Sequence, residues 1–311
     1  TSPGLVANDM RPLGWSAISV LGPMARDVED TAFMLQASMG PHPMDPLSMG
    51  VRHDTVWPIR NVDLRTLRVA YTEDFGACAV DPMIRRVFRQ RIAAISREVA
   101  VCEPLDWHMA DGHRCFDVIR AESFLAAFED VYRTQPETLG PNVRANVEMA
   151  ASITLADRAR AHLTQTRFLR QFQTAFETYD LIIAPVTPVS PFPWTELYAT
   201  VIDGQAQRNY YEWLSLTYMV TLATNPALSQ PCGRDESGMP FGLQLVGPLH
   251  QDGHLLSMAA ALEAWCEQDA QTARPRSDLS TLTQPNPDLR SIVTHPPRYG
   301  PGMTVDVLNA V

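Results

Sequence analysis

Lysine is absent from this chain, and all 25 of its basic side chains are arginines. A guanidinium keeps its proton at any pH a protein experiences. These residues therefore offer no Schiff-base lysine, no P-loop lysine and no serine–lysine dyad. The sequence also contains no Gly-Gly pair and no G-x-S-x-G motif, so it lacks the nucleophile elbow of the α/β-hydrolases.

Cysteine is sparse and scattered. The chain has five cysteines and no CxxC pair, which argues against a disulfide framework and against a zinc ribbon. We expect reduced, mostly buried thiols in a cytoplasmic protein. No apolar run approaches the length needed to cross a bilayer, and no signal peptide is visible. We therefore expect no membrane partner.

Basic residues are fewer than acidic ones, so the formal net charge of the 311 residues is −10. A nucleic-acid groove needs a basic surface to neutralise phosphates, so we expect no nucleic-acid partner. Apolar residues make up 45% of the chain and charged residues 19%, as in an ordinary globular protein. The length is sufficient to bury a large core.

The hydrophobic periodicity predicts an α/β fold. An amphipathic helix should follow Asp27 and end before Gly40-Pro41. A strand at 68–71, a helix opened by Pro82 and a strand at 99–102 form a predicted βαβ unit with parallel strands. Additional segments are expected to be helical at 115–132, 155–179, 210–222 and 252–268, and extended at 180–184, 227–231 and 241–246.

Proline is concentrated in two segments. Residues 185–194, PVTPVSPFPW, cannot be a central strand because each proline removes a ladder donor. We expect an extended loop at the carboxyl end of strand 180–184, where α/β sheets usually place ligands. Residues 274–311 are rich in proline, serine and threonine without apolar periodicity, so we predict a poorly ordered tail after a domain at 1–273.

Three blocks of the sequence resemble the amidase signature family. The first is GPMAR at 22–26, followed by Val28 and Asp30; the second is NPALS at 225–229, followed by PCG at 231–233; the third is GLQLVGP at 242–248. They occur in the family's order and span roughly residues 1–270. The resemblance implies a mixed sheet with helices on both faces, incomplete at the amino-terminal side.

The resemblance also implies a reaction. Members hydrolyse a carboxylic amide to an acid and ammonia or an amine through a serine ester, without metal or cofactor. Their chemistry uses a lysine, a bridging serine and a nucleophilic serine on a glycine-rich loop that would lie just before Thr1. We therefore assign no catalytic residue in this sequence and predict that the chain is inactive by itself. Thr224 departs from the glycine that the family usually has before Asn-Pro.

Substrate contacts are predicted from the proline-rich loop. Thr187, Pro188 and Trp194 could line an acyl pocket for a small-molecule amide, with Trp15 on its other side. The alternative is that each of these residues packs within a loop or the core.

Other nucleophiles find little support in the sequence. Thr1 suggests an N-terminal nucleophile, but that chemistry belongs to a sandwich of two antiparallel sheets, which the predicted βαβ unit contradicts. Ser16 or Ser19 with a histidine and a carboxylate would be a triad without its usual elbow.

The sequence gives equally little evidence for a metal site. His108, His113 and Cys115 lie close in sequence but without a second ligand pair. His250 and His254 are four apart at a predicted helix start. Solvated or capping side chains explain both groups, so we predict no metal site.

Two further interpretations stay open. The chain could be a non-catalytic remnant or binding partner, or part of the glutaminyl-tRNA-forming amidotransferase, one of whose subunits shares the same blocks. The partners left open are a homodimer and a complementing amino-terminal half.

Overall fold

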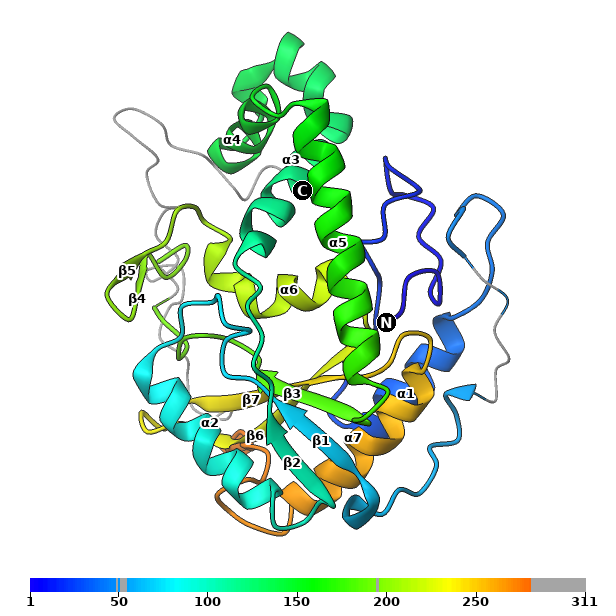
Figure 1. The fold of residues 1–311 in the computed structure, drawn as a ribbon, viewed down its shortest axis with the longest axis vertical. Coiled ribbons are helices and arrows are strands. Elements are labelled where there is room, and N and C mark those ends of the chain that lie inside the picture. The colour runs from blue at the N-terminus through cyan, green and yellow to red at the C-terminus, as the bar shows by residue number, and fades with distance from the viewer. Residues whose placement is uncertain (49, 51–54, 194–195, 281–311) are drawn as a thin grey trace.

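The computed structural model describes residues 1–48, 50, 55–193 and 196–280. Its centre is a five-stranded sheet in the order β2-β1-β3-β7-β6. The sheet lies at the base of the molecule in Figure 1, next to helices α2 and α7, and helices α3, α4 and α5 rise away from it. The predicted tail at 274–311 lies largely outside the described residues.

The predicted βαβ unit is confirmed. Strand β1 (Arg68–Tyr71) leads to helix α2 (Pro82–Ile95) and then to β2 (Val101–Pro104), which pairs with β1 in parallel. Asp81 caps α2 by accepting from the Met83 amide at 2.7 Å, and Pro82 stands at the first turn, where a missing N–H costs nothing. The second strand begins two residues later than predicted, because the amides of Ala100 and Val101 both donate to the carbonyl of Leu67.

The other half of the sheet is antiparallel. Strand β3 (Leu181–Pro185) pairs in parallel with β1 and antiparallel with β7 (Pro240–Val246). Strand β6 (Ala227–Arg234) pairs antiparallel with β7 and forms one edge of the sheet. The sheet is therefore mixed, as the resemblance implies. Beyond Pro185 the described part of the proline-rich run, 186–193, contains no strand.

The helices follow the predicted periodicity with shifted ends. They are α1 (Val28–Ser38), α3 (Asp111–Thr134), α4 (Pro141–Ala150), α5 (Leu155–Ala175), α6 (Ser215–Ala223) and α7 (Asp252–Cys266). Asp27 caps α1 through the Asp30 amide at 2.8 Å. Helix α4 was not predicted, since it buries only Asn146 and Val147 and carries no apolar stripe. Three short 3-10 turns (Leu64–Thr66, Pro136–Thr138, Glu212–Leu214) and a small hairpin of β4 (Val201–Ile202) and β5 (Gln205–Ala206) complete the described elements.

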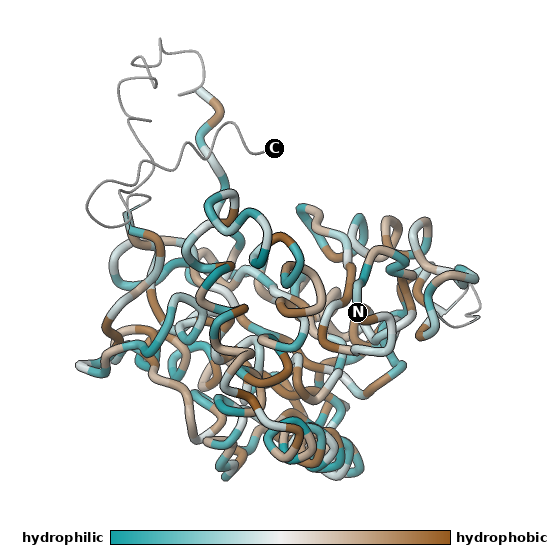
Figure 2. Tube along the Cα trace, turned by 90° about the horizontal axis from the view of Figure 1, so that it is seen from above, coloured by the Kyte–Doolittle hydropathy of each residue, from teal (hydrophilic) through white to brown (hydrophobic). Residues whose placement is uncertain are grey.

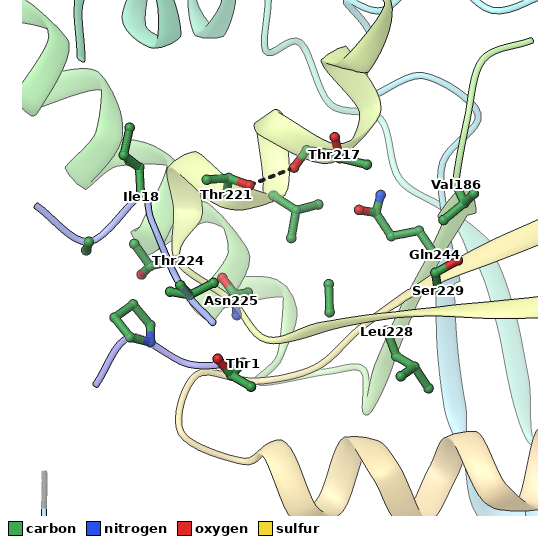
Figure 3. Close-up of a pocket in the computed structure, with 15 residues that line it drawn as sticks. Thr1, Ile18, Val186, Thr217, Thr221, Thr224, Asn225, Leu228, Ser229 and Gln244 are labelled. Atoms are coloured by element: carbon green, nitrogen blue, oxygen red, sulfur yellow. Dashed lines mark hydrogen bonds between the residues drawn. The ribbon is translucent and has the colours of Figure 1, made fainter. Parts of the chain in front are cut away.

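Helices cover both faces of the sheet. Alternate side chains of each strand point to opposite faces, so they reach different helices. On one face, Gln244 of β7 donates to the Leu216 carbonyl of α6 at 3.1 Å. Gln230 of β6, on the opposite face, reaches the Ala259 carbonyl of α7. Figure 3 shows the same arrangement, with α6 above and α7 below the two strands.

The core lies between these layers. Its largest fully buried side chains include Phe75, Phe88, Phe168 and Phe172 together with the β3 residues 181–183. In Figure 2 the hydrophobic stretches of the chain gather toward the middle of the molecule. All five cysteines are free thiols. Within the part of the chain described, no helix is both long and apolar enough to span a membrane.

The irregular segment 1–21 contacts the start of α7 and the chain at residues 40–45. Ser2 donates from its amide and its hydroxyl to the Asp252 carboxylate, at 2.7 and 2.6 Å. Arg11 and Asp45 form a buried ion pair, and the Gly40 amide donates to the Leu5 carbonyl at 3.0 Å. These contacts hold the segment in place beside the cavity described below.

Candidate functional site

A cavity of about 260 Å³ lies between α6, the edge strand β6 and the segment 1–20. Figure 3 shows its lining side chains converging from these elements and from β7. We call it the α6 cavity. It is lined by Thr1, Pro3, Ala17, Ile18, Val20, Val186, Thr217, Val220, Thr221, Thr224, Asn225, Ala227, Leu228, Ser229 and Gln244.

The lining is apolar with neutral polar groups, and none of the described residues that form it has a charged side chain. The two α6 hydroxyls turn back on their own helix: Thr217 donates to the Leu214 carbonyl at 2.8 Å, and Thr221 donates to that of Thr217 at 3.1 Å. The Thr1 hydroxyl donates to the Leu21 carbonyl at 2.7 Å. Because no lining side chain titrates near neutral pH, none of these side chains can serve as a general base.

One buried polar atom on the cavity wall lacks a partner. Asn225 is 6% exposed, and its Nδ2 donates to the Gly247 carbonyl at 2.9 Å. Its Oδ1 has no hydrogen bond among the described residues. Figure 3 shows that oxygen turned toward the α6 side and the nitrogen turned away. An unsatisfied buried acceptor costs about 1–3 kcal/mol.

Thr224, at the junction of α6 and β6, is held in a left-handed conformation with φ of 60°. This is the position where the family usually has glycine, so the backbone keeps the glycine conformation under a β-branched residue. A left-handed residue with a Cβ costs roughly 1–2 kcal/mol.

We expect Thr224→Gly to stabilise the chain by about 1 kcal/mol, since relief of the strain exceeds the entropy that glycine adds to the unfolded state. Urea unfolding should show the midpoint rising. Ala223→Gly is the matched control, because Ala223 is the last residue of the right-handed helix α6. It should lower stability by up to about 1 kcal/mol. A destabilised Thr224→Gly variant would contradict the strain argument.

The three described residues among the predicted substrate contacts are not part of the cavity lining. The Thr187 hydroxyl donates to the Val189 carbonyl at 3.1 Å, and the carbonyl of the buried Pro188 accepts the Asp81 amide at 2.9 Å. Trp15 is 80% exposed, and Trp194 lies outside the described residues. Among residues 185–193, the described part of the proline-rich loop, only Val186 lines the α6 cavity. A role in substrate binding for these four residues stays a prediction.

The structure gives no support to the histidine, metal and serine candidates among the described residues. His113 bonds through Nδ1 to the Tyr218 hydroxyl at 2.5 Å and through Nε2 to the Ala77 carbonyl at 3.1 Å. Within the described residues no cluster of three metal-ligating side chains occurs, and no hydrogen bond joins Ser16 or Ser19 to a histidine. The mixed sheet also differs from the two-sheet sandwich of N-terminal nucleophile enzymes.

Sequence reasoning did not single out Thr217, Thr221 or Gln244 as site residues. A signal was nevertheless present, because Asn225 to Ser229 form the second family block and Gln244 lies in the third. Both blocks surround the α6 cavity, so the family pattern marks this end of the sheet.

The fold is that of an α/β protein with a mixed sheet. The model of the amidase family matches residues 12–256, and the chain belongs to that family. The A subunit of the glutamyl-tRNA(Gln) amidotransferase of Moorella thermoacetica is 27% identical over 272 residues, which cover 80% of this chain and 54% of that protein. Its counterpart from Clostridium acetobutylicum is 27% identical over 275 residues, covering 80% and 56%.

Solved structures agree on the fold. A bacterial aryl acylamidase of the amidase signature family superposes with a TM-score of 0.73 at 18% identity, covering 88% of this chain and 60% of that one. A structure described as a vestigial protein complex, which reveals the origins of an s-triazine catabolic enzyme, has a TM-score of 0.70 at 22% identity, covering 82% and 54%. The chain thus spans about half the length of the curated relatives it matches.

Proposed function

We propose that this chain is the carboxyl-side part of an amidase and that it does not turn over amides by itself. The parent reaction is hydrolysis of a carboxylic amide to an acid and ammonia or an amine through a serine acyl-enzyme. The observation that carries the proposal is the absence of lysine from all 311 residues, in a family whose chemistry starts from a lysine.

The chemistry explains why this absence matters. A neutral lysine must take the proton that activates the serine, whereas arginine stays protonated. The tetrahedral intermediate also needs backbone N–H donors, each typically contributing about 3 kcal/mol, and the family draws these from a glycine-rich loop. No Gly-Gly pair is present here, and no titratable side chain lies among the described residues that line the α6 cavity.

In such an enzyme this chain would supply part of the fold and contacts to the substrate. The sheet and α6 supply a neutral wall next to the family blocks. Thr187, Pro188, Trp15 and Trp194 are the proposed contacts of a small-molecule amide. The partner that would complete the site is an amino-side half of the family fold. A homodimer is the other assembly left open, but a second copy of this chain brings no lysine. The free thiols suit a cytoplasmic setting.

Ammonia release tests this proposal. The purified 311-residue chain, incubated with isobutyramide and benzamide, should release no more ammonia than buffer. Ser229→Ala and Ser16→Ala variants, purified in parallel, serve as controls, because activity from a contaminating host enzyme would be the same in all three preparations. Turnover that disappears in one of the serine variants would contradict the proposal.

A second candidate is suggested by the names of the relatives, which are subunits of a glutamyl-tRNA(Gln) amidotransferase. The net charge of −10 does not favour RNA contact. The described lining of the α6 cavity offers no charged partner for the α-ammonium and α-carboxylate of glutamine. Glutamine added to the ammonia assay distinguishes the two candidates once a complete site is assembled. A non-catalytic remnant or binding protein would release no ammonia from any amide.

A further inference from the structure

Two cysteines that lie far apart in the sequence meet inside the fold. Cys232 of β6 and Cys266 at the end of α7 have their Sγ atoms 3.9 Å apart, and both residues are at most 1% exposed. Among the described residues, no hydrogen bond joins any of the other three thiols to a second thiol; Cys115 donates instead to the Ala161 carbonyl at 3.2 Å. Cys232 and Cys266 are therefore the thiols best placed to form a disulfide.

A close backbone approach brings the two thiols together. Gly233, directly after Cys232, has φ of 78°, and a Cβ there would lie 1.9 Å from the Gln271 carbonyl oxygen. A residue without a Cβ lets this part of β6 pack directly against the turn that follows α7. In that turn the Thr272 hydroxyl donates to the Cys266 carbonyl at 2.8 Å, which fixes the end of the helix and the position of its thiol.

A buried arginine stands beside Cys232. Arg91 of α2 is 8% exposed and donates to the carbonyls of Cys232 at 3.1 Å and Arg234 at 3.0 Å, and no carboxylate pairs with it among the described residues. The hydrogen bond from the Cys266 thiol, and then the charge of Arg91, lower the pKa of Cys232 against the effect of burial. With Cys266 as the donor, the same bond raises the pKa of Cys266. A cysteine next to a guanidinium is of the reactive kind.

The remaining thiols lack this activation. Burial raises the pKa of Cys78 to about 12 and that of Cys102 to about 11. It also raises the pKa of Cys115 to about 12. Because the thiolate is the nucleophile, these three cysteines should react with an oxidant more slowly than Cys232.

A second cavity gives small molecules an approach to the pair. Its volume is about 670 Å³, and its lining includes Arg91, Arg234 and Gln271. Arg91 lines this cavity and also donates to the Cys232 carbonyl, so its side chain lies at the boundary between the cavity and Cys232. A small uncharged oxidant in the cavity therefore stands one side chain away from the thiols.

We infer that Cys232 and Cys266 form a reversible disulfide when the chain meets a peroxide, and that Arg91 is the positioning residue that activates Cys232. The Cys232 thiolate attacks one oxygen of hydrogen peroxide, the O–O bond breaks, hydroxide leaves and the sulfur becomes a sulfenic acid. The Cys266 sulfur then attacks the sulfenic sulfur, its proton goes to the departing oxygen, and water leaves as the S–S bond forms. Two thiols are oxidised and one peroxide is reduced to two waters.

The disulfide would tie the edge strand β6 to the end of α7. The sulfurs need to approach by about 2 Å to reach the bond length near 2.05 Å, a shift within reach of one side-chain rotation. Strand β6 also supplies Ala227, Leu228 and Ser229 to the α6 cavity, so the link acts on a strand of the candidate site. Transient, redox-sensing disulfides are the usual kind in a cytoplasmic setting. The inference does not depend on the proposed function.

Peptide mapping after peroxide treatment tests the disulfide. The folded chain is treated with hydrogen peroxide, its remaining thiols are alkylated in denaturant, and the digest is analysed by mass spectrometry. The expected product is one cross-linked pair of peptides that contain Cys232 and Cys266, and dithiothreitol should restore both thiols. The urea midpoint should rise on oxidation and fall back on reduction, because the bond closes a loop in the unfolded chain.

Three variants separate the roles. Cys266→Ala removes the second thiol and should leave Cys232 as a sulfenic acid that dimedone labels. Cys102→Ala is the matched control, since Cys102 is half-buried and has no thiol partner, and it should form the disulfide at the wild-type rate. Arg91→Gln keeps amide donors but removes the charge, so it should slow the disulfide about tenfold at neutral pH. That rate should recover as the pH rises, which a merely structural defect would not show.

The oxidation of Met24, which is 92% exposed, reports whether the peroxide dose was sufficient. Cys232 and Cys266 that stay reduced while Met24 is oxidised would overturn the inference. Disulfides scattered among all five cysteines, or a cross-link that forms only in denaturant, would also overturn it. Equal rates in wild type and Arg91→Gln at neutral pH would contradict the role of Arg91.

Discussion

Replacing Asp45 by asparagine should destabilise the chain by about 3 kcal/mol, the typical cost of leaving one charge of a buried ion pair without its partner. The Asp45 carboxylate is fully buried, and the Arg11 side chain is 5% exposed. The carboxylate accepts from Arg11 at 2.5 Å, from the Asn8 amide at 2.8 Å and from the Leu47 amide at 2.9 Å. Asparagine keeps the shape but removes the charge that compensates the guanidinium.

This pair also shapes the candidate site. Arg11 donates to the Ser16 carbonyl at 2.9 Å, which fixes the turn that delivers Ala17 and Ile18 to the wall of the α6 cavity. We therefore expect Asp45→Asn to increase hydrogen exchange across 8–19 as well as to lower the urea midpoint. Asp63→Asn is the control, because Asp63 pairs with Arg65 on the surface and exposed pairs contribute little.

The effect of Asp45 should depend on pH. Burial alone would raise the pKa of Asp45, but the two backbone amides and Arg11 outweigh it and hold that pKa below its ordinary value. A carboxyl whose pKa is lowered on folding stabilises the protein above its unfolded pKa, near 4, and loses that contribution as the pH falls through the folded pKa. The gap between wild type and Asp45→Asn should be constant from pH 5 to 8 and shrink below about pH 4. A gap independent of pH down to 3 would contradict the ion-pair assignment.

Asp117 should have the second largest effect. This α3 residue is 5% exposed and accepts from the Tyr211 hydroxyl at 2.8 Å and from Arg208 at 3.0 Å. Both partners precede α6, so the carboxylate fixes the entry of the helix that carries Thr217 and Thr221. Asp117→Ala leaves the buried hydroxyl with only the weak Met149 sulfur acceptor at 4.0 Å and should cost about 2–3 kcal/mol.

Two variants separate the hydrogen bond from packing. Asp117→Asn retains an acceptor for Tyr211 and should lose about half as much stability as Asp117→Ala. Asp130→Ala is the matched control, since Asp130 lies on the exposed end of α3 with a surface partner, and should be close to neutral. Burial, reinforced by the Asp117 charge, raises the pKa of Tyr211. Because a raised acid pKa favours folding only below the unfolded value, wild-type stability should fall above about pH 10. If Asp117→Ala proved as mild as Asp130→Ala, the role of Asp117 at the entry of α6 would be disproved.

The sequence was most informative where local pattern and tertiary packing agree. The stripe of α2, from Ile84 to Ile95, and the apolar run of β3 are both fully used in the core, so their periodicity predicted the parallel part of the sheet. The predicted α-helix at 210–222 begins only at Ser215, because Tyr210 and Tyr211 contact α3 side chains and Glu212–Leu214 form a 3-10 turn. Such long-range contacts leave no local signature.

The candidate site was less accessible for the same reason. Five stretches of chain far apart in sequence converge on the α6 cavity, and only the Asn225–Ser229 and Gln244 blocks carried a recognisable pattern. The proline-rich loop follows the carboxyl end of β3, as predicted, but among its described residues only Val186 contributes to the wall. The departure from glycine at Thr224 marked the position in the sequence, and the backbone angles show the strain there.

The most direct measurement of the central claim is the intact mass of the 311-residue chain after incubation with a fluorophosphonate, which reacts with serines activated by a base. The account predicts an unmodified mass, because no residue of this chain can deprotonate a serine in the manner of the family. A stoichiometric adduct on a single serine would show a working nucleophile and contradict the account.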